Sequence, residues 1–160
     1  MIHPTFLLNL TMLLFCNTIL EAICEDTSSE ANGFFTSPNY PEDYGHVFCE
    51  YFIEVNALSK ITITFAELDL EIQGHVAYDY LYYGVGLRTD RVDGGMFIGS
   101  RKPEPFAMET DSGLWFLLET DGSNFRDFRG FSFSWETGKC LLYKWISVNF
   151  IHRISLGFGF

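Results

Sequence analysis

Hydrophobic and polar residues alternate along four segments in the middle of the chain: residues 49–55, 60–65, 113–119 and 131–135. In the first of these, the apolar side chains from Cys49 to Val55 fall on one face and the two glutamates fall on the other. Alternation with a period of two predicts β-strands that bury one face and expose the other. Since no window of about 11 residues in this region shows a helical stripe, the pattern predicts antiparallel sheets packed as an all-β sandwich.

Turn-forming residues, mostly Gly, Pro, Asn and Asp, separate the predicted strands. They occur in the segments 37–41, 56–57, 84–86, 93–95, 111–113 and 121–122. Aromatic residues make up 18% of the chain, which fits a sandwich core filled by large rings. The rings predicted to pack in this core are Phe65, Phe116, Phe131, Phe133 and Trp135.

The N-terminal 22 residues differ from this middle region. They carry an apolar run between Phe6 and Leu20, and Ala22 offers a cleavage point just before Ile23. This pattern predicts a secretory signal peptide over residues 1–22, and the alternative is an uncleaved N-terminal anchor. No later segment approaches the roughly 20 continuous apolar residues of a membrane helix, so we expect no membrane span after removal of the signal.

The remaining chain divides into a predicted domain over residues 23–138 and a C-terminal tail over residues 139–160. The domain holds 20 Asp and Glu against seven Lys and Arg, a formal charge near −13. Such a field repels phosphates and argues against nucleic-acid binding, whereas it attracts cations and basic partners. The tail has three basic residues, no acidic residue and apolar residues at a strand period. It is an additional strand, a linker or a poorly ordered end, and its sequence assigns it no function.

Four cysteines occur in the chain. Cys16 lies in the predicted signal peptide and leaves with it. Cys24 and Cys49 flank a 25-residue excursion and are the obvious disulfide pair in an oxidising compartment. Cys140 is left over, either as a free thiol or as one half of an intermolecular bridge.

Carboxylate, hydroxyl and amide side chains occur at the ends of several β-type segments. They belong to Glu71, Asp79, Asp121, Ser123 and Asn124. The set offers oxygen ligands and neither a thiolate nor an imidazole, which suits Ca²⁺ better than zinc. Three alternatives stay open: these side chains serve only as turn residues or caps, Asp69 replaces Glu71 as the inward carboxylate, or acidity serves solubility alone.

The order of these motifs resembles that of a CUB domain, a module of extracellular proteins. The resemblance rests on Cys24, Gly33-Phe34, Ser37-Pro-Asn-Tyr-Pro41, Cys49-Glu-Tyr51, Ile61 to Phe65, Leu70-Glu71, Tyr78-Asp-Tyr-Leu81, Gly99, Asp121-Gly-Ser123 and Gly130-Phe131. It covers about residues 24–136 and implies a jelly-roll-like sandwich of two antiparallel sheets that binds proteins or glycans. The family usually has a second disulfide, and its two positions are occupied here by Ala77 and Ile98.

The resemblance also implies roles for single residues. The calcium-binding members use a glutamate, an aspartate eight residues later and an Asp-x-Ser-Asn turn, a pattern matched by Glu71, Asp79, Asp121, Ser123 and Asn124. Tyr40, in the 37–41 turn, is implied to support this site, with mere packing as the alternative. A lysine of the partner is implied to enter an acidic socket formed by outward oxygens of Glu71, Asp79 and Ser123.

Enzymatic functions find no support in the sequence, which lacks the His-Glu-x-x-His motif of zinc proteases and the Gly-x-Ser-x-Gly motif of serine hydrolases. We therefore expect a secreted, non-catalytic module that binds Ca²⁺ and recognises a basic partner protein. One alternative is the non-catalytic CUB part of a larger secreted protease or matrix protein. Another is a spermadhesin-like glycan binder that uses a sheet face and ignores the metal.

Overall fold

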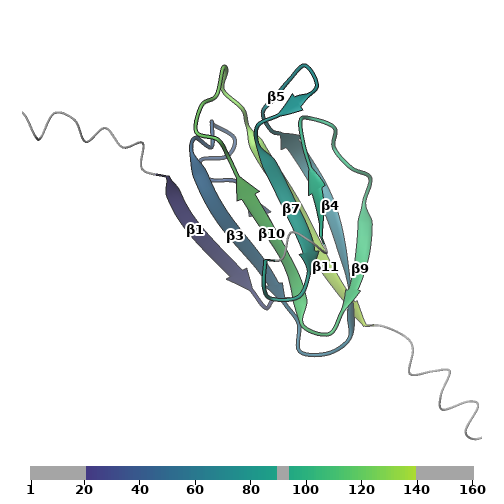
Figure 1. Cartoon of the computed structure of the whole chain (residues 1–160). Helices are drawn as coiled ribbons and strands as arrows, with labels where there is room; N and C mark the ends of the chain where they lie inside the picture. Colours follow the sequence, from purple (N-terminus) through teal and green to yellow (C-terminus); the bar gives the residue numbers. More distant parts are fainter. Residues whose placement is uncertain (1–20, 90–93, 140–160) are drawn as a thin grey trace, which may run out of the picture.

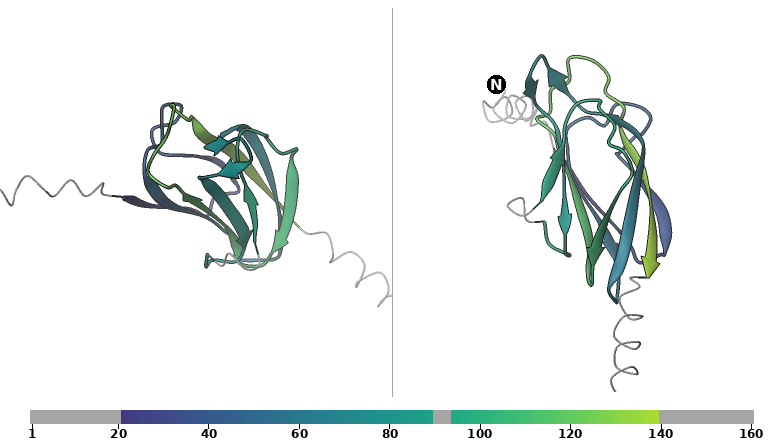
Figure 2. Two further views of the ribbon diagram at one scale, coloured as in Figure 1. Left: turned by 45° about the horizontal axis from the view of Figure 1, so that its top comes forward. Right: turned by 90° about the vertical axis from the view of Figure 1, so that its right-hand side faces the viewer.

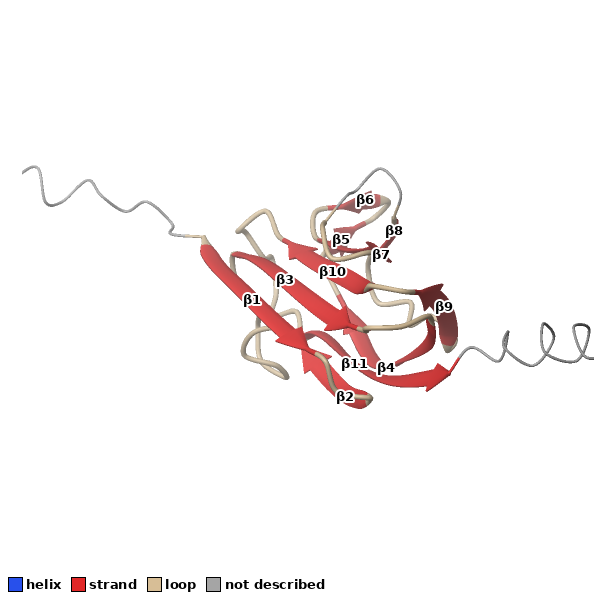
Figure 3. Cartoon of the chain, turned by 90° about the horizontal axis from the view of Figure 1, so that it is seen from below, coloured by secondary structure: helices blue, strands red, loops and turns tan. Residues whose placement is uncertain are grey.

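The computed structural model describes residues 21–89 and 94–139, and within them the chain forms eleven β-strands (Figure 1). Figure 3 shows strands and loops throughout this part of the chain. Within the same ranges, no helix is long and apolar enough to cross a membrane. Cys16, Cys140, almost all of the predicted signal peptide and the tail beyond Lys139 lie outside the described residues.

Two sheets pack face to face and enclose the core (Figures 1 and 2). The five-stranded sheet has the order β1 (Ala22–Ser28), β3 (Val47–Glu54), β10 (Gly113–Glu119), β7 (Tyr80–Val85) and β8 (Gly95–Phe97). The four-stranded sheet has the order β2 (Asn32–Thr36), β11 (Gly130–Lys139), β4 (Ser59–Asp69) and β9 (Phe106–Thr110). A short hairpin of β5 (Ile72–Gln73) and β6 (Val76–Ala77) stands at one end of the sandwich, at the top of Figure 1. The all-β sandwich is therefore confirmed.

The pairing between strands is antiparallel with one exception among the described residues. β1 runs parallel to β3, so that Ala22 lies opposite Val47 and Cys24 lies opposite Cys49. The parallel pair lies at the edge of the larger sheet, and the expected sandwich of two antiparallel sheets is otherwise confirmed. Most side chains of β1 are exposed, and the alternation that identifies the central strands is missing from it.

The predicted alternation is present where a strand faces the core on one side and solvent on the other. Cys49, Tyr51 and Ile53 of β3 are buried, and Val55 lies just beyond the strand and is half-buried. The rings expected in the core, Phe65, Phe116, Phe131, Phe133 and Trp135, are all buried. Phe116 and Phe133 contact each other across the two sheets, with ring centroids 4.5 Å apart.

β10 departs from the alternation because it is buried on both faces. Trp115 lies on the outer face, where a Cβ added to the neighbouring Gly84 would sit 2.5 Å from its ring. On the same face, the Thr89 hydroxyl donates a hydrogen bond to Glu50, which pairs with Leu117 of β10. The segment after β7 therefore lies over the outside of the sheet, and the central strand has no solvent-exposed face.

A disulfide joins Cys24 of β1 to Cys49 of β3, as predicted. The two residues are direct partners in the parallel register, with Cα atoms 4.5 Å apart. Ala77 and Ile98 stand where the second family disulfide is usually found, and the Ile98 side chain is 38% exposed. An isoleucine that faces solvent to this extent fills the space between the strands only in part.

Candidate metal centre

Three carboxylates converge at the end of the sandwich that carries the β5–β6 hairpin. Glu71 follows β4, Asp79 precedes β7, and Asp121 follows β10. One carboxylate oxygen from each lies within 4.8 Å of the other two. Glu71 is 4% exposed and Asp79 is fully buried, whereas Asp121 is exposed. The sequence places the three residues far apart, and the sheet topology brings them together.

Asp79 is held at the bottom of this cluster by hydrogen bonds. It accepts one from the hydroxyl of Tyr44 and another from the backbone N–H of Asp121, 3.1 Å away. The Tyr44 hydroxyl also accepts a hydrogen bond of 3.1 Å from the backbone N–H of Glu71. Burial and the contact with Asp79 raise the pKa of Tyr44, so this phenol stays protonated and keeps donating. Tyr44 thus links two of the three carboxylate residues.

The charge of Glu71 is only partly compensated, by a hydrogen bond from the backbone N–H of Phe125 and by the attraction of Arg126. Its Oε2 is buried and has no hydrogen-bond partner among the described residues. Burial raises the pKa of Glu71, and repulsion by Asp79 and Asp121 raises it further. Burial also raises the pKa of Asp79, although the hydrogen bonds from Tyr44 and Asp121 oppose this effect. Buried carboxylates at this spacing are costly unless a cation compensates their charge.

Ser123 and Asn124 lie beside the cluster but make different contacts. The backbone N–H and the hydroxyl of Ser123 donate to Asp121 Oδ1 at 2.9 and 3.3 Å. Asn124 donates from Nδ2 to Asp43 Oδ1 at 2.7 Å, which leaves its amide oxygen as the remaining polar atom of the side chain. Both residues line a hollow of about 310 Å³, whose other walls are Glu71, Gln73, Tyr78, Asp121 and Phe125.

Tyr40, which the resemblance implied as a support of this site, contacts a carboxylate outside the cluster. The Tyr40 hydroxyl donates to Glu67 Oε2 at 2.7 Å, and it is Tyr44, four residues later, that contacts Asp79 and Glu71. Both tyrosines belong to the connection between β2 and β3. This connection contains a turn in which Asn39 has a positive φ. Sequence spacing does not indicate which ring such a connection turns inward.

Asp69 and Glu71, the two candidates for the inward carboxylate, have different neighbours. Asp69 faces Arg126, whose guanidinium donates two hydrogen bonds to its carboxylate, while Glu71 points into the cluster. Asp79 is fully buried and does not line the hollow. Glu71, Asp121 and Ser123 line this hollow, whereas the outward-facing oxygen expected of Asp79 does not.

Sequence comparison gives a match to the model of the CUB domain over residues 24–135. Human Tolloid-like protein 1 is 33% identical over 106 residues, which cover 66% of this chain and 10% of that protein. Bone morphogenetic protein 1 of Xenopus laevis is 31% identical over 106 residues, or 66% of this chain and 15% of the relative. The chain thus spans only a small part of the length of these curated relatives.

Among solved structures, the MASP-1 CUB2 domain bound to Ca²⁺ matches with a TM-score of 0.58 and 26% identity. The match covers 69% of this chain and 96% of that domain. CUB domains occur in extracellular proteins such as the Tolloid-like relatives. The chain therefore belongs to the CUB domain family, whose members are non-catalytic modules for protein interaction.

Proposed function

We propose that this domain is a secreted recognition module that binds Ca²⁺ and then a basic side chain of a partner protein. The observation that carries the proposal is the buried, unpartnered Oε2 of Glu71 beside two further carboxylates. A hard cation that prefers oxygen ligands and tolerates irregular coordination fits this set. Glu71, Asp79 and Asp121 would hold the ion, and the oxygens of Ser123 and Asn124 lie beside them.

A bound ion would convert the repulsion among the three carboxylates into attraction. It would also leave the exposed Asp121 and Ser123 at the edge of the hollow, next to Glu71. Such an acidic rim suits a lysine ammonium, which is a compact charge with three donors. The calcium ion in the MASP-1 CUB2 structure supports this proposal by analogy. The Cys24–Cys49 disulfide is the kind of bond that persists in the oxidising extracellular space.

Calcium is expected to stabilise the folded domain. For a dissociation constant of about 0.1–1 mM, typical of extracellular modules, millimolar Ca²⁺ adds about 0.5–1.5 kcal/mol to the free energy of unfolding. The melting temperature then rises by a few degrees. Asp121→Ala removes an exposed ligand, so the variant should fold and lose the calcium response. Thermal melts of both proteins, in calcium and after its removal, measure the effect.

The matched control is Asp111→Ala. Asp111 is exposed in the turn before β10, whereas Asp121 follows the other end of that strand. Both substitutions remove one negative charge, but only the loss at Asp121 should abolish the response to calcium. Wild-type melting curves that coincide with and without calcium would refute the metal site.

The stabilisation by calcium is expected to shrink as the pH is lowered from neutral to mildly acidic values. The pKa values of Glu71 and Asp79 are raised in the folded, metal-free protein, so the folded state binds more protons than the unfolded state. Protonation of these two carboxyl groups therefore stabilises the metal-free fold. This contribution to the free energy of unfolding is fully present below the ordinary pKa values of the two groups, and it is lost as the pH rises through their raised pKa values. Calcium needs the ionised carboxylates, so protons and calcium compete.

This competition is measured by melting the dialysed, metal-free protein and the calcium-loaded protein at each pH. Dialysis is preferable to a chelator, because chelators themselves release calcium in acid. A shift in melting temperature that stayed constant from neutral to acidic pH would contradict a role for these buried carboxylates.

A further inference from the structure

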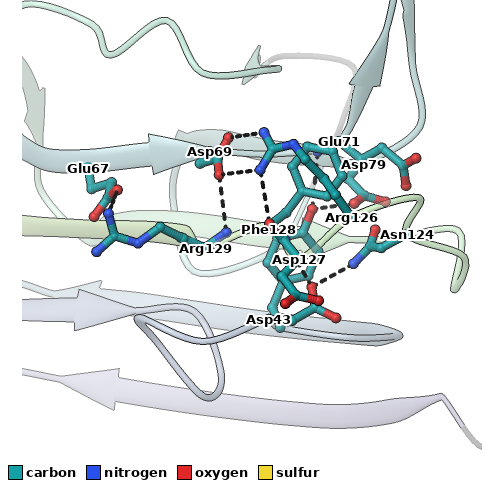
Figure 4. Close-up of polar contacts among 11 residues, drawn as sticks. Asp43, Glu67, Asp69, Glu71, Asp79, Asn124, Arg126, Asp127, Phe128 and Arg129 are labelled. Atoms are coloured by element: carbon teal, nitrogen blue, oxygen red, sulfur yellow. Dashed lines mark hydrogen bonds and ion pairs between the residues drawn. The ribbon is translucent and has the colours of Figure 1, made fainter.

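The loop between β10 and β11, residues 120–129, carries Asp121, Ser123 and Asn124, and side chains from distant segments hold it at several points. Asp79 accepts a hydrogen bond from the backbone N–H of Asp121 at 3.1 Å. The carboxylate of Asp43, in the connection between β2 and β3, accepts two: from Asn124 Nδ2 at 2.7 Å and from the backbone N–H of Phe128 at 3.3 Å. These contacts fix the loop to the residue before β7 and to the connection between β2 and β3, and Figure 4 shows Asp43 beside Asn124 and Phe128.

Arg126 makes the most extensive of these contacts. Its guanidinium donates to both oxygens of Asp69, at 3.1 and 2.8 Å, and to the carbonyl of Asp127 at 2.9 Å. It also lies 3.8 Å from the ring centroid of the buried Phe128. The backbone N–H of Arg129 donates to Asp69 at 3.3 Å as well. Asp69 ends β4, two residues before Glu71, so this contact fixes the loop against the strand that delivers Glu71.

The charge of Arg126 has the wrong sign to assist a cation directly. Arg126 interacts electrostatically with Glu71, one of the proposed ligands. A positive charge near a metal site repels the ion, so electrostatics alone predicts that Arg126 weakens calcium binding. Its two hydrogen bonds to Asp69 and its contact with Phe128 point to a geometric role instead. A bidentate arginine–carboxylate pair whose guanidinium also lies over an aromatic ring is better ordered than a typical surface ion pair.

We propose that Arg126 is a positioning residue for calcium: through Asp69 and Phe128 it holds the β10–β11 loop so that Asp121 stays beside Glu71 and Asp79. This inference rests on the proposed calcium function. A loop that is already ordered loses less conformational entropy when the ion binds, and therefore binds it more tightly. Residues that contact and orient metal ligands without touching the metal commonly contribute about 10- to 100-fold to the metal affinity.

The test is the sign of the change in calcium affinity in Arg126→Leu, measured by calorimetry on the folded protein. Loss of a nearby positive charge would tighten calcium binding, whereas loss of the positioning contact weakens it. We expect the dissociation constant to rise about tenfold. Arg126→Lys keeps the charge and loses the two-pronged contact, so we expect a weaker affinity than wild type for this variant as well.

Arg129→Leu is the matched control. Arg129 ends the same loop and carries the same charge, but its guanidinium pairs with Glu67 at 2.6 Å and not with Asp69. This variant should bind calcium as tightly as wild type or slightly more tightly. Amide hydrogen exchange without calcium gives a second readout, and we expect faster exchange across residues 120–129 in Arg126→Leu than in Arg129→Leu.

Two failures are distinguishable. A wild-type protein that takes up no calcium would contradict the proposed function, and this inference with it. A wild-type protein that binds calcium, with Arg126→Leu equally tight or tighter and exchange across the loop unchanged, would contradict the inference alone.

Discussion

Replacing Cys24 and Cys49 together by alanine is expected to lower the free energy of unfolding by about 2–5 kcal/mol. The bond closes a 25-residue separation in sequence, for which the chain-entropy estimate is about 3.5 kcal/mol. Apart from its backbone pairing with β3, β1 makes few buried side-chain contacts, because it is an edge strand whose side chains are mostly exposed. Urea unfolding of the oxidised protein measures the loss as a lower midpoint.

The control for this prediction is Cys140→Ser, which should leave the unfolding midpoint unchanged. Cys140 lies outside the described residues, and we expect it to take no part in the Cys24–Cys49 bond. Peptide mapping under non-reducing conditions identifies the pair directly. A Cys49–Cys140 bridge in the mapped protein would place the boundary of the domain beyond residue 138.

Sequence patterns predict the fold well where a strand has one buried and one exposed face. β3 and β4 are of this kind, because each contributes alternate side chains to the core. β10 lacks the alternation because Trp115 is covered on the outer face by a segment more than 20 residues away in sequence. β1 lacks it for the opposite reason, since most of its side chains are exposed. Alternation in sequence indicates a strand with one buried and one exposed face. The burial of β10 and of β1 depends instead on whether other segments of the chain cover their faces.

The candidate site divides in the same way. Glu71, Asp79 and Asp121 were predicted from their types and from a family pattern, and the fold brings them together. Tyr44 and Arg126 were not predicted, because their roles depend on the path of two irregular connections. The carboxylates have a chemical signature that is visible in sequence, whereas the residues that orient them are recognised only by their contacts.

Binding to a lysine-bearing surface is expected to require calcium. A suitable probe is a biosensor surface that carries many copies of a lysine-containing peptide, because one exposed contact is weak and several copies act together. We expect binding by the calcium-loaded domain, loss of binding in chelator and weaker binding at raised salt, since salt screens exposed charges. Glu71→Gln keeps the shape of the side chain and removes its charge, and it should abolish binding while the domain stays folded.

The same probe tests whether the hollow is specific for an ammonium. Glu71, Asp121 and Ser123 surround a hollow of about 310 Å³ that Tyr78 and Phe125 wall on other sides. A lysine presents a compact charge with three donors to such a rim, whereas the planar guanidinium of arginine is suited to two-pronged contacts with one carboxylate. We therefore expect the arginine peptide to bind more weakly than the lysine peptide at equal density, and the N-acetyl-lysine peptide not to bind.

Asp111→Ala should bind the lysine peptide as wild type does, because Asp111 lies at the opposite end of β10. Undiminished binding in chelator would contradict this prediction. It would mean that the peptide binds to another surface and that calcium has a structural role only.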